Sequence, residues 1–234
     1  MKFEIIQNPI RWLILFHVVC GAVALGVFMI PLLSKKGGKL HIKVGWLYTY
    51  AMVFVGVSAF IITPWRAFFD EARTSSSIGF SAFLFFIAAF TLSSLWNGLR
   101  VLKFKKRETS NTELAQMVPP IILIVLGLAT QVLGYFLNNI LLMTFPFLSH
   151  FTAKDQLKYW LSSPKEKMHW WYFHMNGMFA ACIATVTAFL VTAIPRVFPG
   201  NAIAESPILW IAPGVILGIV LKKWTMSFRT QFGD

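Results

Sequence analysis

The sequence predicts an all-α fold, a polytopic bundle of transmembrane helices that forms one integral membrane domain over residues 1–234. Hydrophobic residues make up 57% of the 234 residues, and charged residues make up 13%. The mean hydropathy of +0.67 lies well outside the range of soluble domains. The apolar residues gather in runs long enough to cross a hydrocarbon core of about 30 Å as helices. Short polar loops separate these runs.

The first half of the chain predicts three spans. Asn8-Pro9 is a typical helix start, with proline at the first helical position, and the first span then runs to about Leu33. This run lacks a small-residue cleavage site, so we expect it to remain as a membrane helix rather than be removed as a signal peptide. The second span covers about residues 44–64 and the third about residues 78–99.

The stretch from Met117 to Ala153 decides the number of spans, because it is too long for one membrane helix at about 1.5 Å per residue. Asn138-Asn139 in its middle is a turn signal. A tight hairpin there gives a fourth span over about residues 118–136 and a fifth over about 140–153, interrupted by Pro146. If the stretch forms a single span instead, the total is six.

Two further spans close the chain, over about residues 170–195 and 207–221. The first of them carries a histidine and small side chains at spacings of three and four, which place them on one helix face. This stripe consists of His174, Gly177, Ala181, Ala184 and Ala188. It would let a neighbouring backbone or a flat cofactor come close. Residues 163–166, Ser-Pro-Lys-Glu, resemble a capping box and predict that the helix begins at about Pro164.

The basic residues favour seven spans. With the N-terminus outside, the loops at 34–43, 100–116 and 154–169 and the C-terminal tail place 16 of the 21 lysines and arginines on the cytoplasmic side. With six spans the division is 11 to 10, which is no bias. Because basic residues prefer the cytoplasmic side, we expect seven spans, N-out and C-in, in a bacterial inner membrane. The net charge of +12 then reflects topology rather than binding of nucleic acid.

The spans contain few groups suited to chemistry. No carboxylate falls at the centre of a span, which argues against a proton-driven transporter. Cys20 and Cys182 are expected to be small packing residues. Histidine is the intramembrane side chain best suited to acid-base work or ligation. The polar side chains within the spans include His17, Asn97, Gln131, His150, His174 and Asn176.

Two histidines precede a glycine by one helical turn. His17 is followed by Gly21, and His41 is followed by Gly45 and then Tyr48. Residues four apart share a helix face, so we expect open space one turn beyond each histidine, as a flat ring would need. In the seven-span topology His17 lies in the outer part of its helix. The histidines expected near the cytoplasmic face are His41, His150, His169 and His174.

Two cofactors are compatible with these positions. His41 and His174, on facing helices, would ligate a b-type haem, and the small-residue stripe beside His174 would make room for the porphyrin. Alternatively, His41, His150 and His174 would hold zinc in a metal-dependent membrane enzyme. The residues expected to surround either group are Asn97, Asn176 and Tyr48.

A non-catalytic alternative explains the same residues by packing. The histidines are then structural side chains with satisfied hydrogen bonds. The stripe, like Gly214-x-x-x-Gly218 in the last span, is then a helix-packing seam. The protein would be a membrane subunit or scaffold that associates with the bilayer and with other membrane subunits or a second copy of itself.

Four ordered blocks carry a family resemblance: HVVCG from His17, KGGKLHIKVGWLYTYAM from Lys36, WYFHMNGMFAACIATVTAFLV from Trp171 and PGVILGIVLKKW from Pro213. In this order they resemble an uncharacterised family of bacterial polytopic membrane proteins, a predicted membrane-protein domain of unknown function. The resemblance implies that the family's recurring histidines, and hence the cofactor-binding candidates, are His17, His41 and His174. His150 and His169 fall outside the blocks, and the resemblance implies no activity.

Overall fold

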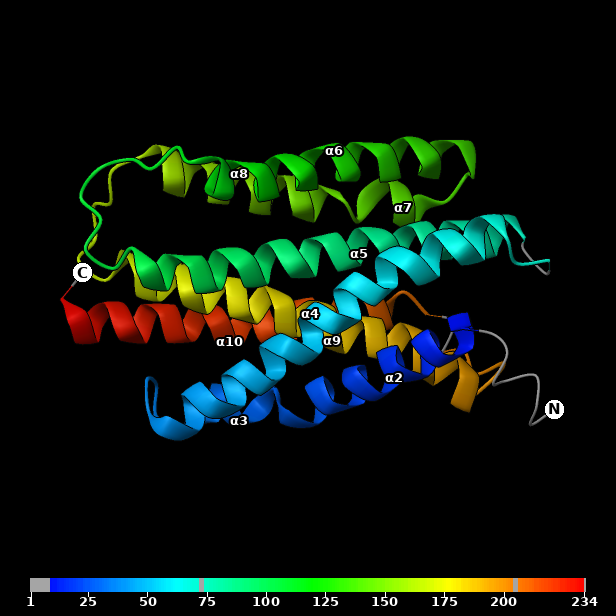
Figure 1. The fold of residues 1–234 in the computed structure, drawn as a ribbon, viewed down its shortest axis with the longest axis horizontal. Coiled ribbons are helices and arrows are strands. Elements are labelled where there is room, and N and C mark those ends of the chain that lie inside the picture. The colour runs from blue at the N-terminus through cyan, green and yellow to red at the C-terminus, as the bar shows by residue number, and fades with distance from the viewer. Residues whose placement is uncertain (1–8, 72–73, 204–205, 234) are drawn as a thin grey trace. The chain divides into compact units, whose positions relative to one another are not determined.

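The structure, a computed structural model, describes residues 9–71, 74–203 and 206–233, and within these residues the chain is helical and contains no strand (Figure 1). Among the described residues, six helical segments are long and apolar enough to cross a membrane. They are Pro9–Leu33, which contains α2 and α3, and the helices α4 (Lys39–Phe68), α5 (Ser75–Arg100), α6 (Leu114–Phe136), α9 (His169–Val197) and α10 (Ile208–Phe232). The chain is therefore an all-helical, multi-pass membrane protein.

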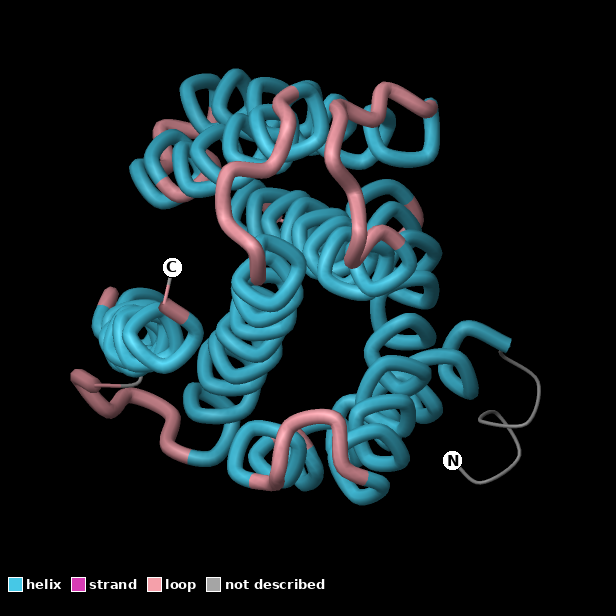
Figure 2. Tube along the Cα trace, turned by 90° about the vertical axis from the view of Figure 1, so that its left-hand side faces the viewer, coloured by secondary structure: helices cyan, strands magenta, loops and turns pink. Residues whose placement is uncertain are grey.

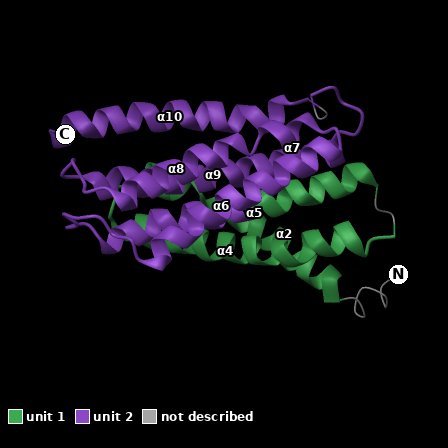
Figure 3. Cartoon of the chain, turned by 90° about the horizontal axis from the view of Figure 1, so that it is seen from above, with its two compact units in different colours: residues 1–88 green, residues 89–234 purple. Residues whose placement is uncertain are grey.

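The helices form two compact units, residues 1–88 and residues 89–234 (Figure 3). Unit 1 is built on α2 (Pro9–Val27) and α4, which pack along each other. The imidazole Nδ1 of His17 on α2 lies 2.8 Å from the Oγ of Ser58 on α4. The rings of Phe60 on α4 and Phe85 on α5 have centroids 4.8 Å apart. The His17–Ser58 contact thus joins α2 to α4, and the Phe60–Phe85 contact joins α4 to the first part of α5.

A break at Phe28 separates α2 from the short helix α3 (Met29–Leu33). Gly37 then turns the chain towards α4 with a φ of 73°, a conformation that favours glycine. The predicted first span, with its start at Pro9, is confirmed. Asn8, its predicted N-cap, lies outside the described residues.

In unit 2, α5 and α9 cross at two glycines. A Cβ added to Gly177 would lie 2.7 Å from both the Gly98 Cα and the Ser94 carbonyl oxygen. Ala181 and Ala184, further along the same stripe, are buried. The stripe therefore acts as a packing seam at this crossing. The space that the sequence suggested for a porphyrin beside Gly177 is filled by the backbone of α5.

After α6 the chain reverses and runs back along it as two helices, α7 (Ile140–Thr144) and α8 (Phe147–Leu161) (Figure 1). The break between them falls at Phe145-Pro146, because proline cannot donate a backbone hydrogen bond within a helix. The interruption predicted at Pro146 is confirmed. Together α7 and α8 return to the end of unit 2 at which α6 begins.

The hairpin between α6 and α7 has the turn predicted at Asn138-Asn139. Asn138 adopts a φ of 49°, and the Asn139 side chain accepts hydrogen bonds from the N–H groups of Leu141 and Leu142. This is a typical N-cap. Gly134 permits the close approach, because a Cβ there would lie 2.7 Å from the Cβ of Leu142.

α8 ends at Leu161 rather than near Ala153, so the predicted end of the fifth apolar segment is wrong. The buried residues of α8 are Ser149, Ala153, Gln156 and Trp160, at helical spacing. One face therefore packs inside unit 2 while the opposite face carries the exposed charges. Hydropathy along the chain drops at the first of these charges and does not detect the buried face.

α9 begins at His169, so the start predicted at Pro164 is wrong. A capping box needs the Glu166 side chain to turn back towards the N–H of Ser163. Its carboxylate instead forms an ion pair with Arg229 of α10, with a separation of 2.6 Å. A contact with a distant helix thus overrides the local signal.

α10 continues to Phe232, beyond the end predicted near Leu221. The rings of Phe228 and Phe232 pack on Trp171 of α9, with centroid separations of 5.3 and 5.4 Å. These aromatic contacts stabilise about three further turns of α10, which carry the C-terminal charges.

Segments far apart in sequence meet at one end of unit 2, which Figure 2 views end-on. The α5–α6 loop, which opens with the short helix η1 (Val101–Lys103), lies beside the α8–α9 loop, since Asn111 N–H donates to the Trp160 carbonyl over 2.8 Å. The Arg229–Glu166 ion pair brings the end of α10 to the same place. Of the thirteen lysines and arginines in residues 89–234, nine lie in these two loops or in the last turns of α5, α8 and α10.

The α5–α9 crossing predicts a large stability difference between two glycines. Gly177→Ala should lower the stability of the detergent-purified protein by about 1–3 kcal/mol, because its methyl group meets backbone atoms that cannot rotate away. Gly218→Ala on α10 is the matched control, since a Cβ there meets no atom within 4 Å. Thermal unfolding measures both variants. Equal melting temperatures would contradict the close crossing.

Candidate functional site

His174 lies near the start of α9 and is held by the last turn of α5. Its Nδ1 is 2.7 Å from the carbonyl oxygen of Gly98. A carbonyl can only accept, so the neutral ring carries its proton on Nδ1 and its lone pair on Nε2. Metal-binding histidines are commonly oriented in this way, by a carbonyl that accepts from the nitrogen that does not ligate.

His41 and His17 of unit 1 are oriented in the same way. Nδ1 of His41 lies 3.0 Å from the carbonyl oxygen of Pro31. Nδ1 of His17 lies 2.8 Å from the Ser58 Oγ, whose own hydroxyl donates to the Phe54 carbonyl over 2.7 Å. Each neutral ring therefore keeps its lone pair on Nε2. All three histidines singled out by the sequence blocks share this tautomer.

The side chain of His41, on α4, contacts the carboxyl end of α3, where carbonyl groups lack partners within the helix. The Pro31 carbonyl also accepts from Lys36 Nζ over 3.0 Å, and Lys36 bonds to the Leu32 carbonyl as well. Burial lowers the pKa of the Lys36 ammonium from its ordinary value. One turn beyond His41, a Cβ on Gly45 would meet no atom within 4 Å, so the open space predicted there is confirmed.

His150 has a different role, at the break between α7 and α8. Its Nε2 donates to the Oε1 of Gln131 over 2.9 Å, and the Gln131 amide donates to the Met143 carbonyl over 3.2 Å. That carbonyl lies in the last turn of α7, where helical partners are missing. Gly127 on α6 accommodates the ring, because a Cβ there would lie 2.7 Å from the imidazole Cε1. His150 therefore supports the interrupted helix.

A buried polar network joins α5 to α8. The Trp160 indole N–H donates to the Oδ1 of Asn97 over 2.8 Å, and the Asn97 amide donates to the Ser93 carbonyl over 3.0 Å. The Ser93 hydroxyl donates to the Oε1 of Gln156 over 3.2 Å. Asn97 is 1% exposed and Trp160 is fully buried. The amide of Asn97 is therefore committed to holding α8 against α5.

The other two residues expected around a cofactor lie in contrasting settings. Tyr48 is buried on α4, one turn beyond Gly45. Asn176 is exposed on α9, two residues after His174. Of the three predicted surrounding residues, Tyr48 and Asn97 are thus interior and Asn176 is not.

Arg107 is a structural centre that the sequence analysis missed. Its guanidinium donates to the carbonyls of Tyr159 and Ser162 over 2.7 and 2.8 Å, and lies 4.6 Å from the centroid of the Tyr159 ring. The Tyr159 hydroxyl lies 2.7 Å from Nδ1 of His169, which is buried. The sequence signal that could have indicated this cluster is the pair Tyr159-Trp160 in an otherwise charged segment. Large aromatic side chains in such a segment indicate that one face of the helix is buried.

The predicted zinc ligands are not gathered within either unit. In the described part of the chain, no group of three or more His, Cys, Asp or Glu side chains is arranged to hold a metal ion. His41 belongs to unit 1, whereas His150 and His174 belong to unit 2. His150 and His174 also present different ring nitrogens, since Nε2 of His150 is used by Gln131.

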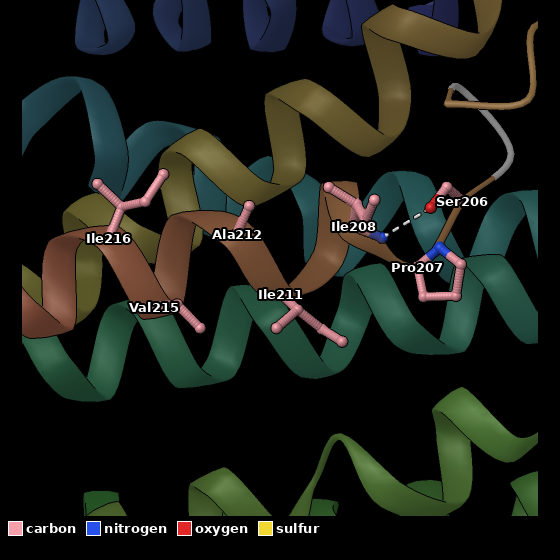
Figure 4. Close-up of a pocket in the computed structure, with 7 residues that line it drawn as sticks. All are labelled: Ser206, Pro207, Ile208, Ile211, Ala212, Val215 and Ile216. Atoms are coloured by element: carbon pink, nitrogen blue, oxygen red, sulfur yellow. Dashed lines mark hydrogen bonds between the residues drawn. The ribbon is translucent and has the colours of Figure 1, made fainter.

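An open hollow of about 500 Å³ follows the first turns of α10 (Figure 4). It is lined by apolar side chains that include Ile208, Ile211 and Val215, and Ser206 Oγ accepts from the N–H of Ile208 over 3.1 Å. The hollow offers no acid, base or ligating group among these residues. Its surface suits the hydrocarbon region of a bilayer.

No protein-family model, curated protein or solved structure matches this chain. The family resemblance of the histidine blocks therefore stays a prediction.

The Asn97–Trp160 contact predicts a strong effect of removing one partner. Asn97→Leu leaves the Trp160 indole N–H buried without an acceptor, which should reduce the stability of the detergent-purified protein by about 1–3 kcal/mol. Asn176→Leu is the matched control on an exposed position and should leave stability nearly unchanged. Thermal unfolding of both variants tests this. A harmless Asn97→Leu would show that the network is dispensable.

Proposed function

We propose that the protein is a haem-b-associated redox protein of the bacterial inner membrane, with His41 and His174 as the first candidate ligands and His17 as the third. When bound, such a haem supplies one-electron transfer. The proposal is carried by one observation: the Nδ1 of each of these histidines lies within hydrogen-bond distance of an oxygen, an arrangement common in metal-binding histidines that ligate through Nε2.

The two leading histidines support the proposal in different ways, His174 by the fixed orientation of its ring and His41 by the open space beside it. His174 is fixed by the 2.7 Å hydrogen bond to Gly98, in the last turn of a long helix. His41 has open space one turn along its helix at Gly45, where the edge of a flat ring can approach the backbone. Neutral imidazole nitrogen is a common axial ligand of haem iron. A fixed ring orientation thus favours His174, and open space along the helix favours His41.

An absorbance spectrum tests the proposal directly. The full chain, expressed with haem available and purified in detergent, should show a Soret band that shifts on reduction with dithionite. His41→Ala and His174→Ala should each lower the haem content per chain by more than about tenfold, because each removes a ligand. His150→Gln is the matched control and should retain haem, since Nε2 of His150 is already the donor to Gln131 and the amide of a glutamine can replace that donor.

The absence of a Soret band in the unaltered protein would end the haem proposal. Elemental analysis of the same sample separates the remaining possibilities. One zinc per chain would support a metal-dependent membrane enzyme instead.

A non-catalytic membrane subunit or scaffold is the second candidate function. It is favoured by the observation that all five histidines have hydrogen-bond partners within their own unit: Ser58 for His17, Pro31 for His41, Gln131 for His150, Tyr159 for His169 and Gly98 for His174. If the histidines are structural, His41→Ala and His174→Ala lower the melting temperature of a protein that has no cofactor spectrum.

We also propose that α7 and α8 together form a further crossing, which makes seven, with the N-terminus outside and the C-terminus in the cytoplasm. In unit 2 the beginnings of α6 and α9 lie at the same end, so the chain between them must cross twice if α6 crosses once. The polar side chain of Gln131 supplies a donor to the Met143 carbonyl at the helix break, as a broken helix inside a membrane requires. The basic residues of unit 2 gather at the end assigned to the cytoplasm.

Labelling of introduced cysteines tests this topology. In a chain with Cys20→Ala and Cys182→Ala, an impermeant thiol reagent added to intact cells should label Asn138→Cys but not Ser163→Cys. With six crossings the two positions lie on the side of the N-terminus, so both are labelled if that end is outside and neither is labelled if it is inside. A reporter fused after Asp234 provides the second readout, and it should be active only on the cytoplasmic side. Activity only in the periplasm would overturn the seven-span topology.

A further inference from the structure

Two basic loops of unit 2 are held together as one surface. The guanidinium of Arg107, in the α5–α6 loop, donates to the carbonyl of Ser162 in the α8–α9 loop over 2.8 Å. The N–H of Asn111 donates to the Trp160 carbonyl over 2.8 Å. These bonds fix the backbone of both loops at the same end of unit 2 (Figure 2). Exposed charges on the two loops therefore act as a group.

This surface carries an excess of positive charge. Its five lysines are Lys103, Lys105, Lys106, Lys165 and Lys167, and all are exposed. The carboxylates of Glu113 and Glu166 are already paired with Arg100 and Arg229 at 3.2 and 2.6 Å. Glu108 is the remaining carboxylate of the two loops. The five lysines thus exceed the negative charge that the loops themselves supply.

An aromatic contact sets the position of one lysine. The ammonium of Lys105 lies 4.5 Å from the centroid of the Trp170 ring, at the start of α9. Trp170 packs edge-on against Trp171, with centroids 5.6 Å apart. Tryptophans at the end of a membrane helix lie at the headgroup level of a bilayer. The lysine is therefore held at the depth of lipid phosphates.

Apolar side chains continue directly from the charged surface. Leu114, at the start of α6, is 78% exposed, and Leu161, at the end of α8, is 52% exposed. A ligand that covers both the lysines and these leucines needs an anionic head and a hydrocarbon tail. Nucleic acid and acidic peptides meet only the first requirement.

We propose that the loops 101–113 and 162–168 form a binding site for an anionic phospholipid, whose phosphate lies against Lys105, Lys106 and Lys165 and whose chain follows the exposed leucines. Juxtamembrane lysines attract anionic lipids in proportion to their number near the surface. The proposal does not depend on a cofactor at the histidines. It holds whether or not the protein binds haem.

Lipid titration followed by native mass spectrometry tests the proposal. The full chain in detergent should bind phosphatidylglycerol more tightly than zwitterionic phosphatidylcholine. The triple variant Lys105→Gln, Lys106→Gln, Lys165→Gln should lower the affinity for phosphatidylglycerol by about tenfold or more, because each lysine near the phosphate contributes several-fold. Its affinity for phosphatidylcholine should not change.

The matched control removes equal charge from the exposed lysines of unit 1, as Lys35→Gln, Lys39→Gln, Lys43→Gln. This variant should keep its affinity for phosphatidylglycerol. An equal loss in both triple variants would mean that general charge attraction accounts for the binding, and would overturn the site. The site is also overturned if the loop lysines govern binding of added single-stranded RNA or polyglutamate but not of phosphatidylglycerol. Melting temperatures of both variants confirm that each remains folded.

Discussion

The carbonyl groups at helix ends impose the constraint on which this structure depends. The last carbonyls of a helix have no partner within it, and a hydrocarbon environment offers no water to replace one. Polar side chains from other segments therefore serve as donors at several helix ends. Lys36 and His41 bond to the end of α3, Gln131 to the end of α7, and His174 to the end of α5. Arg107 does the same for α8.

This constraint links the two candidate functions of the histidines. A histidine that satisfies a carbonyl through Nδ1 is a structural residue, and the same bond fixes its ring for ligation through Nε2. His174 and His41 have this property, whereas His150 uses Nε2 itself to support the helix break. The hydrogen-bond pattern therefore distinguishes His150 from the other histidines, although all five occur in or beside apolar segments.

Local signals predicted most of the fold. Hydropathy located the long helices, and Asn138-Asn139 located the hairpin, because a turn depends on its own residues. The errors arose where a distant contact decides the outcome. Trp160 extends α8 by bonding to Asn97 on α5, and Glu166 pairs with Arg229 instead of starting a helix. For the candidate site, the sequence indicated which histidines to consider, but their tautomers follow only from their partners in space.

The bonds made by Arg107 have a consequence for how the basic end of unit 2 can change over evolution. Its acceptors are backbone carbonyls, which every amino acid provides, so substitutions in the α8–α9 loop do not remove them. The side-chain part of the attachment of the two loops thus comes from Arg107 and needs no matching side chain, and the backbone bond from Asn111 to Trp160 adds to it. Their exposed residues can vary, and the charge that they present can be altered, while the backbone beneath keeps its arrangement.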